Sequence, residues 1–135
     1  MSLAVGVLCS EQSLELAALL TEMESGRLNV NIKAVVADRD SAALTLARNV
    51  GLYGVFVPRA AFHANRDGFE RRLVELFQQA EAEVVVLAGY EREVGHVLKE
   101  SFLGRVYGLG LDPEELVDDL EARIRMRGTA LSLVP

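Results

Sequence analysis

The chain alternates short apolar runs with amphipathic segments of about ten to fifteen residues, and this alternation constrains its fold more than any other feature. The expected strands are Leu3–Leu8, Val30–Val36, Gly54–Val57, Val84–Ala88 and Arg105–Leu109. The expected helices run from about Ser13 to Ser25, from a cap at Ser41 to Val50, from Asp67 to Ala80, from about Glu93 to Phe102, and from a capping box at Asp112 to about Arg127, before Gly128. The pattern predicts an open α/β fold, in which a mostly parallel sheet of about five strands has helices on both faces.

Length and composition indicate one domain covering residues 1–135. Half of the residues are hydrophobic, as expected of a folded domain. The net charge is −6, and this negative charge argues against nucleic acid as a partner. The arginines of the last helix, Arg123, Arg125 and Arg127, are expected to interact favourably with the dipole at its end. The only cysteine, Cys9, lies in an apolar run, which fits a buried thiol in a reducing compartment. Because no run is long enough to span a bilayer and the amino terminus does not resemble a signal peptide, we expect a cytoplasmic protein without a membrane partner.

The loop after the first strand, CSEQSLE, is where a phosphate-binding loop would lie. It contains no glycine, and it places Glu11 and Glu15 where a phosphate would meet negative charge, so nucleotide binding is not expected. Ser10 and Ser13 could each donate one hydrogen bond to a substrate. A serine before a helix is more often its cap, and that is the preferred interpretation of both.

The remaining titratable residues show no catalytic or metal-binding spacing. Asp38 and Asp40 could together hold a metal ion or act as acid and base, but Ser41 follows directly, so we interpret them as helix caps. His63 and His96 each stand alone, without a second histidine or a cysteine at ligand spacing. A metal site is therefore not expected.

The run EVVVLAGYEREVGHVL, with the order of elements around it, resembles the folate-dependent formyltransferase family, and within it the phosphoribosylglycinamide formyltransferases of purine synthesis. Further matches are AVGVLCS, VNIKAVVADRDSAALTLARNVGL and AAFHANRDGFERRLVELFQQAEAEVVVLAGYER. The GR that begins GRVYGLG fits the family's next strand, and the tail ELVDDLEARIRMRGTALSLV is similar to its closing helix. The resemblance implies a Rossmann-like sheet and transfer of a formyl group from formyl-tetrahydrofolate to an amine.

The same resemblance implies that the catalytic residues are missing. The family places an asparagine and a histidine after its fifth strand, where this chain has Gly108 and Gly110. A segment bearing a catalytic aspartate is expected to be deleted, which would shorten the domain internally after residue 110. Ser13, Leu14 and Glu15 replace a glycine-serine-asparagine cradle for the substrate phosphate. Because formyl transfer requires oxyanion stabilisation and a proton shuttle, we predict an inactive domain with no catalytic residue of its own.

Part of the family's ligand-binding cleft is expected to survive. The resemblance assigns the cofactor pocket to Leu87, Ala88, Gly89, Tyr90, Glu91 and Arg92. Arg66 matches an arginine near the family's substrate entrance, and Ser10 and Ser13 are the other candidate substrate contacts. Formyl-tetrahydrofolate is the expected cofactor if the cleft is retained. A surface salt bridge with Glu93 or a neighbouring residue is the alternative interpretation of Arg92. The predicted role is a module that binds a small molecule or a protein, and the alternative is an active formyltransferase, or a related folate enzyme, completed by a partner chain.

The predicted deletion has a structural consequence for the fifth strand. Without further strands, residues 105–109 are expected to form an edge with unpaired backbone groups. The final helix could cover this edge, or a second copy of the chain could extend the sheet across it. A homodimer through residues 105–109 is therefore a hypothesis.

Overall fold

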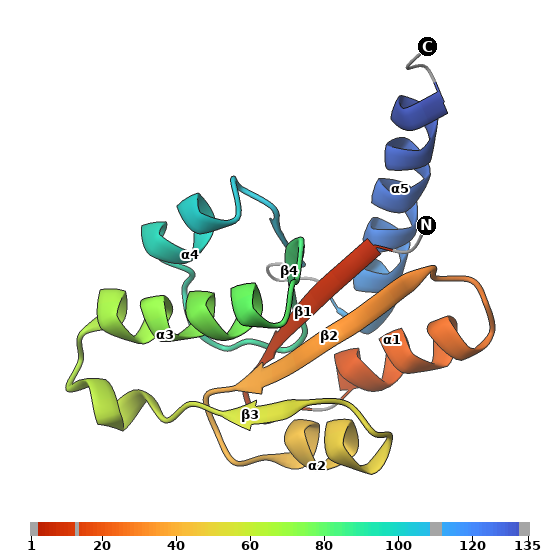
Figure 1. Ribbon diagram of the computed structural model, residues 1–135. Helices are drawn as coiled ribbons and strands as arrows, with labels where there is room; N and C mark the ends of the chain where they lie inside the picture. Colours follow the sequence, from red (N-terminus) through yellow and green to blue (C-terminus); the bar gives the residue numbers. More distant parts are fainter. Residues whose placement is uncertain (1–2, 13, 109–111, 133–135) are drawn as a thin grey trace.

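The computed structural model describes residues 3–12, 14–108 and 112–132, and in it five parallel strands form a sheet with helices on both faces (Figure 1). The strands are β1 (Leu3–Cys9), β2 (Val30–Ala37), β3 (Gly54–Phe56), β4 (Val84–Leu87) and β5 (Val106–Tyr107). The helices are α1 (Leu14–Glu24), α2 (Ala42–Asn49), α3 (Arg66–Gln79), α4 (His96–Ser101) and α5 (Pro113–Ser132), with a short 3₁₀ helix η1 (Arg59–Phe62). The predicted fold class is confirmed.

The strands lie in the order β3-β2-β1-β4-β5, and every neighbouring pair is parallel. The chain builds outward from β1 to β3, crosses back, and continues outward from β4 to β5. β1 and β4 are therefore neighbours at the point where the strand order reverses. In open α/β sheets the carboxyl ends of the strands at this point border the usual ligand-binding crevice.

Two clusters of buried side chains lie on opposite faces of the sheet. Along β4, Val84 and Val86 pack with α1, α2 and α5, whereas Val85 and Leu87 pack with α3 and α4. Helices cover both faces, so successive residues of this strand must all be apolar, as the sequence pattern indicated. On β1, Gly6 leaves room for the ring of Phe77, with which any Cβ at that position would collide.

Several element boundaries differ from the sequence-based expectation. α4 begins at His96 and not at about Glu93, because Gly95 has an extended backbone and serves as the N-cap. β5 contains two residues and not the whole predicted run, of which Leu109 lies outside the described residues. α5 continues through Gly128 to Ser132, so the predicted end at about Arg127 is wrong. A glycine inside a helix costs only about 1 kcal/mol, which does not by itself end the helix.

The first half of α5 packs on the sheet, and the remainder extends beyond it (Figure 1). The side chains of Leu116, Val117 and Leu120 are buried in the same cluster as those of α1. The predicted cap is confirmed: the Asp112 carboxylate accepts a 2.8 Å hydrogen bond from the backbone N–H of Glu115. Among the described residues, no helix is both long enough and apolar enough to cross a bilayer.

Candidate functional site

The segments that follow β1 and β4 meet at the reversal point of the sheet. The Ser10 hydroxyl is fully buried and accepts a 3.0 Å hydrogen bond from the backbone N–H of Glu91, and the N–H of Ala88 donates to the Leu8 carbonyl. Ser10 is thus engaged with the opposite loop, and the interpretation of this serine as a helix cap is wrong. Ser13 lies outside the described residues. The structure therefore brings one predicted substrate contact, Ser10, directly against the predicted cofactor segment.

The predicted cofactor segment, residues 87–92, passes from the core to the surface. Leu87 and Ala88 are buried, Gly89 and Tyr90 are half-buried, and the side chains beyond them are exposed. Gly89 has a φ of +77°, and a Cβ added there would lie 2.9 Å from the Glu15 Oε2 atom. Glycine is therefore favoured by the backbone conformation, and the carboxylate of Glu15 occupies the space beside it.

Glu15 and Asp38 place two buried carboxylate oxygens near this turn. Among the residues that the structure describes, neither Glu15 Oε2 nor Asp38 Oδ1 has a hydrogen-bond partner. Both carboxylates act on the Cys9 thiol: burial, together with the charges of Glu15 and Asp38, raises its pKa to about 12. Cys9 is accordingly a buried thiol and not a nucleophile at neutral pH.

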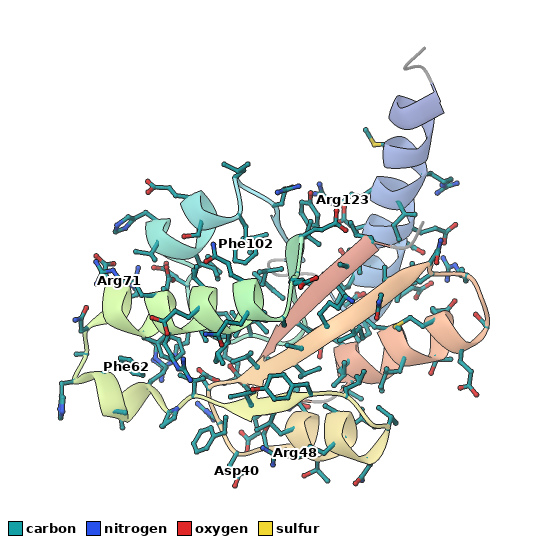
Figure 2. The ribbon with its side chains drawn as sticks, in the orientation of Figure 1. Asp40, Arg48, Phe62, Arg71, Phe102 and Arg123 are labelled. Atoms are coloured by element: carbon teal, nitrogen blue, oxygen red, sulfur yellow. The ribbon has the colours of Figure 1, made fainter. Side chains whose placement is uncertain are left out.

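The two acidic residues that follow β2 differ in environment. Asp40 is exposed and points away from the sheet (Figure 2), whereas Asp38 is only 7% exposed. Ser41 holds the N-cap position of α2, as predicted, but its side chain makes no capping hydrogen bond, and its buried hydroxyl oxygen has no partner among the described residues. The predicted capping bonds from the side chains of Asp38 and Asp40 are likewise not found within the described residues.

Arg39, which follows β2, links the loops after β1 and β4 through two ion pairs. The Arg39 guanidinium lies 3.1 Å from a Glu11 oxygen in the loop after β1 and 3.4 Å from a Glu91 oxygen in the loop after β4. All three side chains are exposed, so we expect each pair to add less than about 1 kcal/mol to stability. Glu91, a predicted cofactor contact, is engaged by this arginine.

Three arginines surround a cavity of about 270 Å³ beside the turn. Its lining residues, which we call the arginine pocket, are Arg59, Ala60, Ala64, Asn65, Arg66, Phe69 and Arg92. Arg59 comes from η1, Arg66 begins α3 and Arg92 follows β4. Two residues predicted from the resemblance, Arg66 and Arg92, are thereby brought together.

The three guanidinium groups of the arginine pocket are held differently. Arg59 donates a 3.2 Å hydrogen bond to the Tyr90 hydroxyl and lies 4.9 Å from the centroid of the Phe69 ring. Arg66 approaches Glu93 at 3.8 Å, and no ion pair of Arg92 is found among the described residues. The alternative interpretation of Arg92, a surface salt bridge with Glu93 or a neighbouring residue, is therefore not supported among the described residues. Burial raises the pKa of the Tyr90 phenol to about 12, so this hydroxyl is protonated at neutral pH.

Sequence reasoning missed Arg59. It follows Pro58 just beyond the third strand, and no local pattern marks it as a site residue. Its position at the carboxyl end of a parallel strand was the one available signal, because such ends converge on one edge of the sheet.

A buried carboxylate anchors the loop that carries Arg92. Glu70 on α3 is 1% exposed and accepts hydrogen bonds from the backbone N–H groups of Gly95, at 2.6 Å, and Leu98, at 2.9 Å. These groups belong to the first turn of α4, which no residue of the helix itself caps. Glu70 therefore caps α4 from another helix and fixes one end of the loop 89–95.

The carboxyl end of β5 has no space for a side chain at residue 108. Gly108 has a φ of +96°, and a Cβ added to it would lie 2.6 Å from Cδ1 of Leu116 on α5 and 2.8 Å from the Leu87 carbonyl oxygen. Gly110 lies outside the described residues. The Leu116 side chain of α5 thus occupies the space into which a side chain on residue 108 would extend.

The two histidines lie on other elements. His63 ends η1 in a left-handed conformation, and His96 begins α4, where its Nε2 is 3.7 Å from an Asp67 oxygen. Both side chains are exposed. Within residues 3–12, 14–108 and 112–132, no group of three His, Cys, Asp or Glu side chains is arranged to hold a metal ion.

Residues 3–108 match the sequence profile of the formyl transferase family. The glycinamide ribonucleotide transformylase 1 of Symbiobacterium toebii is 31% identical, with a TM-score of 0.73 over 78% of this chain and 50% of that chain. The phosphoribosylglycinamide formyltransferase of Coxiella burnetii, solved in complex with CHES, is 27% identical, with a TM-score of 0.72 and the same coverage. A formyltetrahydrofolate deformylase from Pseudomonas putida, 22% identical with a TM-score of 0.70 over 78% of this chain and 37% of that chain, shares the fold.

The chain spans about half the length of the first two of these structures. A comparison with curated proteins finds no match. The profile match ends at residue 108, before α5. The likeness of the tail to the family's closing helix therefore stays a prediction.

Proposed function

This chain belongs to the formyl transferase family, and from that premise we propose that it binds a folate-type anionic ligand in the arginine pocket without transferring a formyl group. The proposal has two parts, retained binding and lost chemistry. Each rests on a different region of the carboxyl edge of the sheet.

The observation that carries the proposal is the contact between α5 and residue 108. Leu116 Cδ1 and the Leu87 carbonyl oxygen both lie closer than 3.0 Å to a Cβ at that position, so an asparagine there requires the Leu116 side chain and the backbone beside Leu87 to shift. Formyl transfer passes through a tetrahedral oxyanion and requires proton removal from the attacking amine. The residues that end β5 and lead into α5, Tyr-Gly-Leu-Gly-Leu-Asp at positions 107–112, include no histidine, asparagine or glutamine to serve either step.

Retained binding is supported by the arginine pocket. Planar guanidinium groups bind carboxylates through paired hydrogen bonds, and Arg92 has no competing carboxylate among the described residues. Folates end in a glutamyl group that carries two carboxylates. The arginine pocket fits such an end, while the adjoining turn at Gly89 and Tyr90 would contact the rest of the ligand.

A phosphate-bearing substrate is disfavoured at the reversal point. The buried oxygens of Glu15 and Asp38 have no partner in the described part of the chain, and they would repel a phosphate group. This supports a ligand of the folate type over a ribonucleotide. It also agrees with the replacement of the family's phosphate cradle, which the sequence indicated.

A completed dimer is a second candidate, favoured by the position of β5. This strand lies at the edge of the sheet, and among the described residues no strand pairs with its outer side. A second copy pairing there could supply groups that one chain lacks. Analytical ultracentrifugation tests it: a monomer at high protein concentration contradicts the dimer, and a dimer with transfer activity contradicts our leading proposal.

The test of binding is a calorimetric titration with 5-formyltetrahydrofolate, which is chemically stable, against 5-formyltetrahydropteroic acid, which lacks only the glutamyl group. The proposal predicts that the formyl folate binds and that the pteroic acid analogue binds more weakly by about tenfold or more, because it offers the arginines one carboxylate in place of two. Equal affinities would contradict the assigned role of the arginine pocket.

A further inference from the structure

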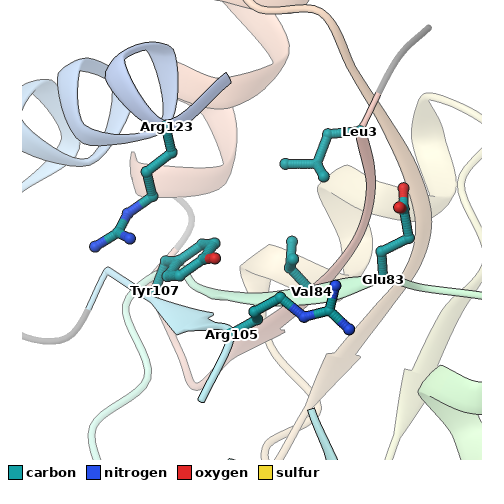
Figure 3. A pocket seen from close by; sticks show the side chains of 6 residues that line it. All are labelled: Leu3, Glu83, Val84, Arg105, Tyr107 and Arg123. Atoms are coloured by element: carbon teal, nitrogen blue, oxygen red, sulfur yellow. The ribbon is translucent and has the colours of Figure 1, made fainter. Parts of the chain in front are cut away.

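A second cavity lies at the opposite edge of the sheet, where the strands begin. It has a volume of about 290 Å³. Its lining residues, which we call the amino-edge pocket, are Leu3, Glu83, Val84, Arg105, Tyr107 and Arg123 (Figure 3). Arg123 comes from α5, which lies beyond the residues that match the family profile. One wall of this pocket is therefore built by a segment outside that match.

Two arginines give the amino-edge pocket a positive wall. The Arg123 guanidinium lies 3.9 Å from the centroid of the Tyr107 ring, and its Nε donates a 2.9 Å hydrogen bond to Asp119. Arg105 donates through its Nε to the Phe102 carbonyl, and among the described residues it forms no ion pair. Each guanidinium has five N–H donors, so both retain donors that an anion can use.

The other surfaces of the amino-edge pocket are apolar or aromatic. Leu3 and Val84 are buried and Tyr107 is half-buried, and Figure 3 shows Tyr107 and Val84 between the two arginine side chains, with Leu3 across the pocket from Arg123. Glu83 directs one oxygen to the backbone N–H of Ala4, at 3.0 Å. The lining thus carries two positive charges and one negative charge beside an apolar floor, in a protein whose net charge is −6.

We infer that the amino-edge pocket binds a small carboxylate that carries one negative charge and an apolar or aromatic body. Asp119 pairs with Arg123, whereas Arg105 has no ion pair among the described residues, so the Arg105 guanidinium is the group that matches one carboxylate through its forked donors. The apolar floor matches the body, and Tyr107 offers a ring face for stacking. The volume lies near the lower end of the range for small-molecule sites, so the ligand is of metabolite size.

The experiment titrates the full chain with benzoate and, separately, with benzamide, which has the same shape without the charge. Backbone amide shifts in ¹⁵N-labelled protein locate the ligand, and their concentration dependence yields Kd. The inference predicts that benzoate shifts the amides of Val84 and Tyr107, and that benzamide binds at least about tenfold more weakly. Because this result comes from the unmodified protein, it does not depend on the folding of any variant.

Substitutions then test whether the two arginines of the amino-edge pocket bind the carboxylate of benzoate. Arg105→Gln and Arg123→Gln should each weaken benzoate binding by about tenfold. Arg125→Gln is the matched control, since its side chain is 72% exposed on the same helix and lies outside the pocket lining. Arg92→Gln separates the two sites: it should leave benzoate binding unchanged, although it alters the arginine pocket.

Three outcomes would overturn the inference. They are equal binding of benzoate and benzamide, amide shifts confined to residues 59–69 and 92, and loss of benzoate binding in Arg92→Gln but not in Arg105→Gln. None of these outcomes contradicts folate binding in the arginine pocket, so the failure of one proposal is distinguishable from the failure of the other.

Discussion

Leu116 on α5 and Gly108 after β5 are packed so closely that a Cβ on the glycine would lie 2.6 Å from the leucine methyl group. This contact connects a segment outside the family match to the position at which the family resemblance places a catalytic asparagine. It also makes the glycine a structural requirement. Both consequences can be tested by mutation.

Gly108→Ala should destabilise the protein by about 2–5 kcal/mol, because it combines a steric overlap with a left-handed backbone that alanine disfavours. The matched control is Gly104→Ala. Gly104 also has a positive φ, of +76°, but no atom lies within 4 Å of a Cβ placed there, so about 1 kcal/mol is expected. Urea unfolding measures both variants, and equal losses would contradict the packing of Leu116 against residue 108.

Arg66→Gln and Arg92→Gln should each weaken binding of 5-formyltetrahydrofolate by about tenfold, because each removes a charge-assisted hydrogen bond donor from the arginine pocket. Arg72→Gln is the control. It removes an exposed arginine of α3 that pairs with Glu75 and does not line the arginine pocket. Calorimetry should show unchanged affinity in the control, and a loss of similar size in all three variants would indicate a general charge effect.

Glu70→Ala should cost about 2–4 kcal/mol of unfolding free energy, since it leaves the N–H groups of Gly95 and Leu98 without their acceptor in a buried site. It should also weaken folate binding, because the loop that carries Arg92 loses its anchor. Glu75→Ala, an exposed change on the same helix, should stay within about 0.5 kcal/mol of the parent. If Glu70→Ala is equally mild, Glu70 does not anchor α4.

These results separate what sequence reasoning could and could not reach. The alternation of apolar runs predicted the sheet, because burial on both faces requires residues such as Val84 to Leu87 all to be apolar. The start of α4 was predicted too early, since its cap comes from Glu70, which is distant in sequence. Boundaries of this kind depend on tertiary contacts that no local pattern records.

In the candidate site, too, local sequence patterns predicted some features, and tertiary contacts determine the others. Gly108 could be recognised as a missing catalytic residue, but the reason for the glycine depends on where Leu116 packs. Asp38 was interpreted as a cap, whereas the path of the chain after β2 buries its carboxylate. Arg59 was not predicted as a site residue, because the arginine pocket is formed by three segments that are separate in the sequence.

Alkaline pH should destabilise the fold. Burial raises the pKa of Cys9 from 9.0 to about 12 and that of Tyr90 from 10.0 to about 12, so the folded state keeps protons that the unfolded chain releases. Stability from these groups is complete below pH 9 and is lost as the pH rises toward 12. Cys9→Ser, whose hydroxyl does not titrate in this range, should show a shallower loss in urea unfolding measured from pH 8 to 11.

Reactivity of the same thiol offers a check. Native protein at pH 8 should react with a thiol reagent only slowly, and protein in urea should react at the rate of a free cysteine. Rapid reaction of the native protein would contradict the burial of Cys9.

The most direct test of the account follows the formyl group itself. Stoichiometric protein is mixed with 10-formyltetrahydrofolate, labelled in its formyl carbon, and glycinamide ribonucleotide, and the label is traced after separation. We predict that labelled folate co-elutes with the protein and that no label reaches the ribonucleotide above the rate without protein. Label on the ribonucleotide in proportion to the protein present would contradict the account, whether one chain or a dimer performs the transfer.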